Sequence, residues 1–175
     1  MMRFFAAASC ALMLSVPATA QLEGQRPIDE EAADLAYGYC PLYLAGRFSL
    51  TGPLLESYGF GKTIQKQPHP RVGEMEMVTS KRSDGELAFG GAAGKACTVV
   101  VSGPQREAAL ARLRTSMAFM GLDMKPAANP GPDVTGVAVE TFKAPMPMGG
   151  QILYVQLIRA TEPTVVAAQL FVMEK

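Results

Sequence analysis

Histidine, cysteine and net charge are scarce in this sequence of 175 residues, and each scarcity excludes a class of function. The chain has a single histidine, His69, so a hydrolase with a histidine base would depend on that residue. Pro68 and Pro70 flank it, which is typical of an extended and exposed loop. No Gly-x-Ser-x-Gly nucleophile elbow occurs. We therefore assign no catalytic residue and expect a binding protein rather than an enzyme.

Charge of one sign is not in excess, because basic and acidic side chains number 16 each. Proteins that bind nucleic acid or anionic membranes by charge need a basic patch, and here the basic residues are dispersed. Long apolar runs are also absent. The longest run is about fourteen residues at the N-terminus, whereas a membrane span needs roughly twenty. The sequence predicts neither nucleic-acid binding nor a membrane span.

The N-terminus has the layout of a secretory signal peptide. Residues 1–3 carry a positive charge, residues 4–16 are apolar, and Ala-Thr-Ala ending at Ala20 forms a cleavage site. We predict cleavage after Ala20, which makes residues 1–20 a leader. Residues 21–175 then form a single exported domain, periplasmic or secreted.

Cysteine is represented by three residues, and the predicted leader contains one of them, Cys10. A lipid anchor on Cys10 is an alternative, but the apolar run before it is too brief for a lipobox. Cys40 and Cys97 remain in the mature chain, and exported proteins meet oxidising conditions, so we predict a disulfide between them. In the chain-entropy model this disulfide stabilises the folded state by about 4 kcal/mol. Without a Cys-x-x-Cys motif it is expected to be structural.

Two amphipathic segments predict the main helices. The first begins at Asp29 and carries apolar residues at helical spacing up to Leu44. Gly38 and Pro41 predict a kink or break in it near Cys40. The second helix is expected over residues 104–120 and is followed by a glycine that suits a helix end. A shorter helical stretch is expected after Pro53.

The remaining segments predict an α+β fold built on an antiparallel sheet of about six strands, with helices packed on it. The expected strands are 74–81, 86–89, 97–101, 134–142, 151–159 and 164–173. Each half of the chain would supply one helix and three strands, which is compatible with an internal repeat or with coincidence. The last two strands are apolar on both faces, so we expect them to be central and covered on both sides. The glycine-rich stretch 90–94 is interpreted as a hairpin loop.

Three residues of the last two strands are candidate ligand contacts. If one face of the sheet carries no helix, Tyr154, Gln156 and Phe171 are expected to lie on a ligand-contacting surface. Burial of these side chains beneath helices would remove the hypothesis.

Met146 and Met148 lie in a loop rich in proline and glycine and are a second candidate site. Soft thioethers together with one histidine can hold Cu(I), although methionine also serves as packing or as a flexible partner contact. The acidic residues Glu74, Glu76 and Glu140 are scattered along the strands, and we expect them to be solvated. No metal site and no cofactor are assigned.

The leading functional hypothesis is an exported, non-enzymatic binding or interaction protein, whose partner is another protein or a small ligand. A small exported hydrolase and a methionine-based copper-handling protein are the alternatives. The oligomeric state is left open by the sequence.

Overall fold

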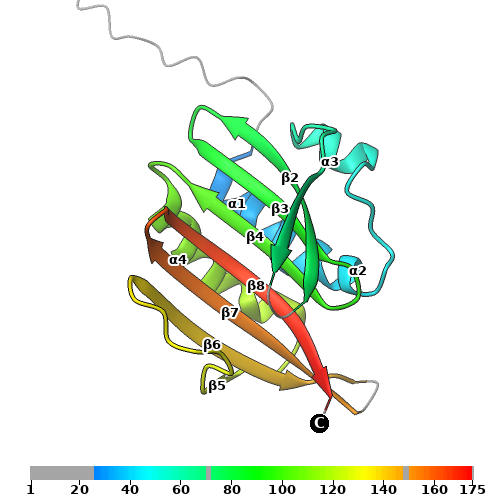
Figure 1. Cartoon of the computed structure of the whole chain (residues 1–175), viewed down its shortest axis with the longest axis vertical. Coiled ribbons are helices and arrows are strands. Elements are labelled where there is room, and N and C mark those ends of the chain that lie inside the picture. Colours follow the sequence, from blue (N-terminus) through cyan, green and yellow to red (C-terminus); the bar gives the residue numbers. More distant parts are fainter. Residues whose placement is uncertain (1–25, 70–71, 148–149, 175) are drawn as a thin grey trace, which may run out of the picture.

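The structure is a computed structural model that describes residues 26–69, 72–147 and 150–174. It contains one antiparallel sheet of eight strands, with helices packed on one of its faces (Figure 1). The α+β class predicted from the sequence is confirmed, but the strand number of six was too low. The predicted leader, residues 1–20, lies outside the described residues.

The elements alternate between helical segments and four-strand meanders. In chain order they are α1 (Ile28–Asp34), the π-helical turn η1 (Leu35–Tyr39), α2 (Cys40–Leu44), α3 (Pro53–Ser57), β1 (Gln65–His69), β2 (Gly73–Arg82), β3 (Gly85–Ala92), β4 (Ala96–Ser102), α4 (Arg106–Ser116), the 3-10 helix η2 (Met117–Met120), β5 (Lys125–Ala127), β6 (Val137–Pro145), β7 (Gln151–Thr161) and β8 (Thr164–Glu174). The strand order in the sheet is β1-β2-β3-β4-β8-β7-β6-β5. The two meanders therefore meet through the β4–β8 pair at the centre.

The two strands missed by the sequence analysis are the edges of the sheet. Pro68 lies in β1, where a loop was expected, and Pro126 lies in β5, where no strand was expected. Proline lacks the N–H that a central strand must donate, but an edge strand tolerates it on its open side. Each half of the chain consequently contributes four strands rather than three. The internal repeat stays a prediction.

The first helical region runs without interruption from α1 to α2 through the π-helical turn η1. It begins at Ile28, one residue before the expected cap Asp29, and Pro27 occupies the cap position. The predicted irregularity near Cys40 is this turn, which contains Gly38 and ends at Tyr39, directly before Cys40. No helix in the described ranges is long and apolar enough to cross a membrane.

The main core lies between the sheet and the helices. Side chains of β3, β4, β7 and β8 that point to this face are almost fully buried, including Leu87, Phe89, Val99, Val101, Val155, Leu157, Val166 and Leu170. On the helix side Leu35 and Leu113 meet them. The predicted cysteine pair is present, since Cys40 of α2 and Cys97 of β4 form a disulfide with their Cα atoms 5.4 Å apart. This bond joins the first helical region to the sheet.

A buried ion-pair network fixes the start of α1 on the β2–β3 hairpin. The side chains of Arg82 and Glu31 are each 2% exposed and form an ion pair. Asp84 accepts hydrogen bonds from Arg82 Nε at 2.9 Å and from the Ile28 backbone N–H at 3.0 Å. Burial opposes ionisation of Asp84, but the hydrogen bonds from Arg82 and Ile28 outweigh it, so its pKa lies below the ordinary value.

The glycine-rich stretch 90–94 is not wholly a hairpin loop as predicted, because Gly90 and Gly91 lie inside β3. Both have φ of +151°, and a Cβ on Gly90 would lie 2.0 Å from the carbonyl oxygen of Glu76. Glycine is therefore required where β3 passes closest to β2.

Candidate ligand-binding pocket

One face of the sheet carries no helix, and Figure 1 shows it toward the viewer with α1 and α4 behind the strands. The strands β7 and β8 are interior to the sheet, as predicted. On this face a loop rather than a helix lies over them, and Gln156 and Ala167 are only 7% and 6% exposed. Alternate residues of these strands point away from the helices, and they include the candidates Tyr154, Gln156 and Phe171. The condition set for these residues is met, because no helix buries them.

A row of polar residues crosses this helix-free face through four neighbouring strands. Thr141 of β6 pairs with Gln156 of β7, which pairs with Gln169 of β8, which pairs with Thr98 of β4. Thr141, Gln156 and Thr98 are only 6%, 7% and 8% exposed, and Gln169 is half-buried. We call these four residues the polar row. Burying uncharged polar groups costs free energy unless they find hydrogen-bond partners.

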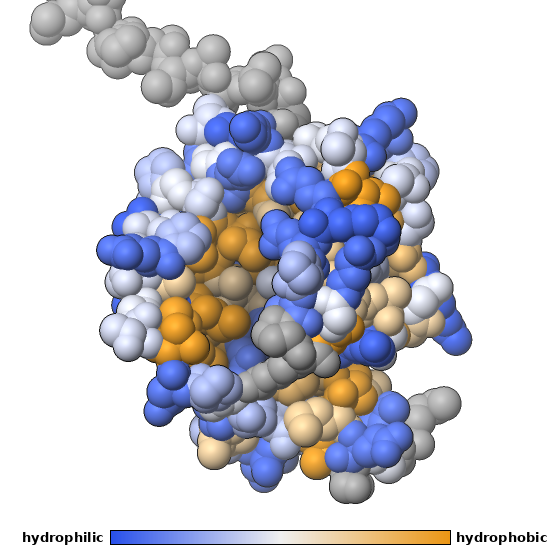
Figure 2. Space-filling view, in the orientation of Figure 1, coloured by the Kyte–Doolittle hydropathy of each residue, from blue (hydrophilic) through white to orange (hydrophobic). Residues whose placement is uncertain are grey.

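Apolar side chains lie on both sides of the polar row. On one side Val139, Ile158, Ala167 and Val100 form the next line of paired positions. On the other side Tyr154 and Phe171 stack, with ring centroids 5.2 Å apart and planes inclined by 4°. Figure 2 shows apolar surface gathered in a hollow over the middle of this face, with hydrophilic side chains around it.

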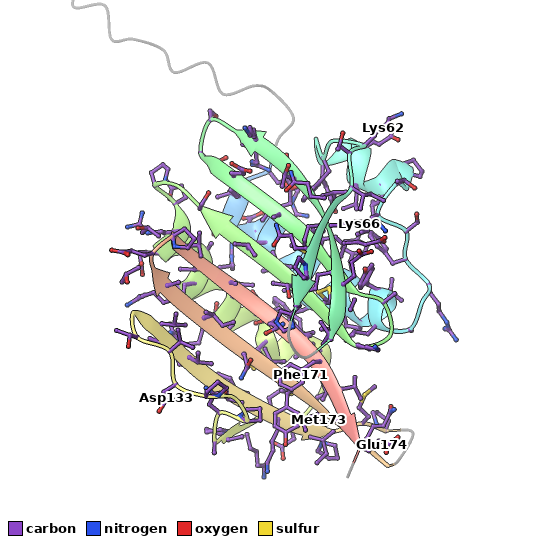
Figure 3. The ribbon with its side chains drawn as sticks, viewed as in Figure 1. Lys62, Lys66, Asp133, Phe171, Met173 and Glu174 are labelled. Atoms are coloured by element: carbon purple, nitrogen blue, oxygen red, sulfur yellow. A yellow bond between two sulfur atoms is a disulfide. The ribbon has the colours of Figure 1, made fainter. Side chains whose placement is uncertain are left out.

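A cavity of about 740 Å³ occupies this hollow. Its floor includes Gln156, Gln169 and Phe171, and its walls come from the loop before β6, from the end of β1 and from the β3–β4 turn. Phe171 and Met173 lie on β8 and Asp133 on the loop that borders the hollow (Figure 3). Cavities of this size hold small molecules in other proteins.

The amide of Gln156 is held in one orientation by its neighbours. The backbone N–H of Gly131 donates to Asn129 Oδ1 at 2.9 Å, which identifies that atom as the acceptor. Gln156 Nε2 donates to the same oxygen at 2.8 Å and to Thr141 Oγ1 at 3.4 Å. Gln156 Oε1 is consequently turned away from these two partners and accepts no hydrogen bond from the described residues. The loop that carries Asn129 is thereby tied to the floor of the cavity.

The one charged side chain in the described lining of the cavity is Lys95. It lies at the β3–β4 turn, and its Nζ is 3.5 Å from the carbonyl oxygen of Val72. No carboxylate belongs to the described lining. The site is therefore suited to an uncharged or anionic ligand and disfavours a cation.

The methionine hypothesis is not supported by the positions of the residues involved. Met146 follows β6 and packs against the core on the helix side, whereas His69 borders the cavity on the opposite face. These two residues are not brought together. Met148 lies outside the described residues. Within the described ranges no three His, Cys, Asp or Glu side chains form a cluster suited to a metal ion.

The acidic candidates are engaged in ion pairs rather than gathered at the cavity. Glu74 and Glu76 both contact Lys66 Nζ, at 2.8 and 3.2 Å. Glu140 accepts hydrogen bonds from Arg114, and this contact lowers the pKa of Glu140, opposite to the shift a general acid needs. Their side chains are 58%, 40% and 48% exposed, so the expectation that these residues are solvated is confirmed, and they form ion pairs at the surface.

Asn129, Gln169, Lys95 and Val139 are pocket residues that the sequence analysis missed. Gln169 could have been found from the sequence, because Gln156 and Gln169 are polar positions inside otherwise apolar strands. Asn129 lies in a loop and Lys95 in a turn, where no periodicity indicates which residues they approach.

Comparison with known proteins gives no match. No family model fits the chain, no curated protein is detectably similar in sequence, and no solved structure is detectably similar to it. The function must therefore be argued from the geometry of this pocket.

Proposed function

We propose that the protein is an exported, non-enzymatic binding protein that holds a small molecule in the cavity on the helix-free face. The observation that carries the proposal is the polar row, which is nearly buried yet lies on a face without helices. A sheet face that only contacts water gains no stability from burying polar groups. A binding site, in contrast, uses a few buried polar groups to orient its ligand.

The surroundings of the polar row support a preformed site. The disulfide and the helices hold the sheet from behind, and the Asn129–Gln156 hydrogen bond holds the loop in front. A ligand would therefore meet groups already in position, which reduces the entropic cost of binding.

Export is the second part of the proposal, and the Cys40–Cys97 disulfide supports it because such bonds persist in oxidising compartments. The intact mass of protein recovered from the cell envelope or medium tests it. We expect a chain that begins at Gln21 and lacks two thiol hydrogens. A chain with residues 1–20 still attached, or with two free thiols after unfolding without reductant, would contradict export.

Binding is tested by filling the cavity from within. Val139 lines it and is half-buried, whereas its neighbour Ala138 points to the other face and is exposed, so Val139→Trp and Ala138→Trp are a matched pair. We expect native mass spectra of the wild type and of Ala138→Trp to show a bound small molecule that is released on unfolding. The same adduct should be absent from folded Val139→Trp. An adduct retained equally by both variants would place the ligand elsewhere, and no adduct on any of them would contradict the proposal.

A further inference from the structure

The hydrogen-bonding groups of the cavity define the class of ligand it takes. This inference rests on the proposed function. We infer that the cavity binds an uncharged aromatic molecule with an amide-type edge, meaning an N–H donor beside a C=O acceptor.

The donor of the ligand is required by Gln156. Its side chain is 7% exposed, and its Nε2 is used by Asn129 and Thr141, so the remaining group is the acceptor Oε1. Gln156 Oε1 is not among the described buried side-chain atoms that lack a partner, so it is accessible from the cavity that Gln156 lines, where a ligand N–H can donate to it. The orientation of the amide is fixed by the Gly131 N–H through Asn129, so Gln156 cannot turn over to present its nitrogen without losing its hydrogen bond to Asn129 Oδ1.

The acceptor of the ligand is required by neighbouring amides. Both lone pairs of Asn129 Oδ1 are used, by Gly131 and Gln156, so Asn129 offers its Nδ2 hydrogens. Gln169, beside Gln156 in the polar row, makes no side-chain hydrogen bond with the described residues. A donor and an acceptor are thus presented side by side, which is the complement of an amide edge.

The aromatic part of the ligand is indicated by the flanks of the polar row. Phe171 lines the cavity and already stacks with Tyr154, while Val139 supplies apolar surface on the opposite flank. A flat ring that extends from the amide contacts both flanks and buries apolar area. The ammonium group of Lys95, with no acid in the described lining, disfavours a ligand cation.

Three probes built on one benzene ring separate the contributions of the amide edge, of charge and of the aromatic ring: benzamide, benzylammonium and toluene. Their dissociation constants are measured by NMR titration of the mature protein, following the methyl group of Met173, which lines the cavity. We expect benzamide to bind about tenfold more tightly than toluene, as one buried hydrogen bond predicts. Benzylammonium should bind most weakly.

The variant Gln156→Leu should abolish the preference for benzamide over toluene while leaving toluene binding intact. Gln151→Leu, an exposed position at the start of the same strand, is the matched control and should keep the preference. If Gln156→Leu melts at a lower temperature yet keeps the preference, Gln156 only positions the loop and the inference is overturned. If all probes bind the wild type equally, the inference fails but the pocket stands. If none binds, the proposed function fails with it.

Discussion

Asp84 illustrates how single polar side chains position the helices behind the pocket. It accepts hydrogen bonds from the Arg82 guanidinium and from the backbone N–H that begins α1 at Ile28. Both bonds favour the charged carboxylate, which is why its pKa lies below the ordinary value despite partial burial. The stability that Asp84 contributes is therefore present above its unfolded-state pKa of about 3.9 and is lost as the pH falls through its folded-state pKa.

The substitution Asp84→Asn is expected to lower the free energy of unfolding by about 1.5–3 kcal/mol at pH 7, the usual worth of hydrogen bonds to a charged group. The difference from the wild type should narrow toward pH 3, because below about pH 3.9 the unfolded-state carboxylate binds a proton more readily than the folded-state carboxylate does. Urea unfolding at both pH values measures it. Asp133→Asn, on an exposed loop position, is the control and should have little effect. A difference of the same size at both pH values would contradict the electrostatic explanation.

Glu31 shows the opposite behaviour at the same residue scale. Its burial raises its pKa even though Arg82 lies against it. A raised carboxyl pKa can indicate a catalytic acid, but Glu31 is a buried residue of α1 on the helix side of the sheet and does not line the cavity. We interpret it as part of the structural network that holds α1, and it gives no support to a hydrolase.

At the scale of elements, the disulfide is the covalent link between the first helical region and the sheet. Replacing both cysteines, as Cys40→Ala with Cys97→Ala, should lower the free energy of unfolding by about 2–5 kcal/mol. Amide hydrogen exchange should accelerate most in η1 and α2, which the bond anchors, and less in β7 and β8. Wild-type protein treated with reductant is the control and should behave like the double variant. Uniform acceleration throughout the sheet would contradict this account.

Much of the secondary structure follows from the sequence, and the exceptions have physical reasons. The disulfide, the two main helices and the six inner strands could be predicted from spacing, β-branched runs and turn residues. The two edge strands were missed because they contain Pro68 and Pro126, and proline usually argues against a strand. That rule applies to central strands, where the N–H that proline lacks is needed for a hydrogen bond. Gly90 and Gly91 were taken for a turn, although their role is to let two backbones approach closely.

At the scale of the whole molecule, one feature of the sequence pointed to the pocket. The apolar character of both faces of β7 and β8 predicted that both faces are covered, and the second face lines a cavity beneath a loop. Tyr154, Gln156 and Phe171 were predicted because they lie on that face. The partner Asn129 could not be found in the same way, since the path of its loop determines that it reaches Gln156.

Removal of a resident molecule from the native protein tests the central claim most directly. Protein purified from its natural envelope fraction is compared by methyl NMR with the same protein after unfolding, dialysis and refolding with its disulfide intact. We expect the two spectra to differ at pocket methyl groups such as Val139 and Met173 and to agree at core groups such as Leu113 and Val101. Identical spectra, or differences in the core with none at the pocket, would contradict the assignment of this face as a binding site.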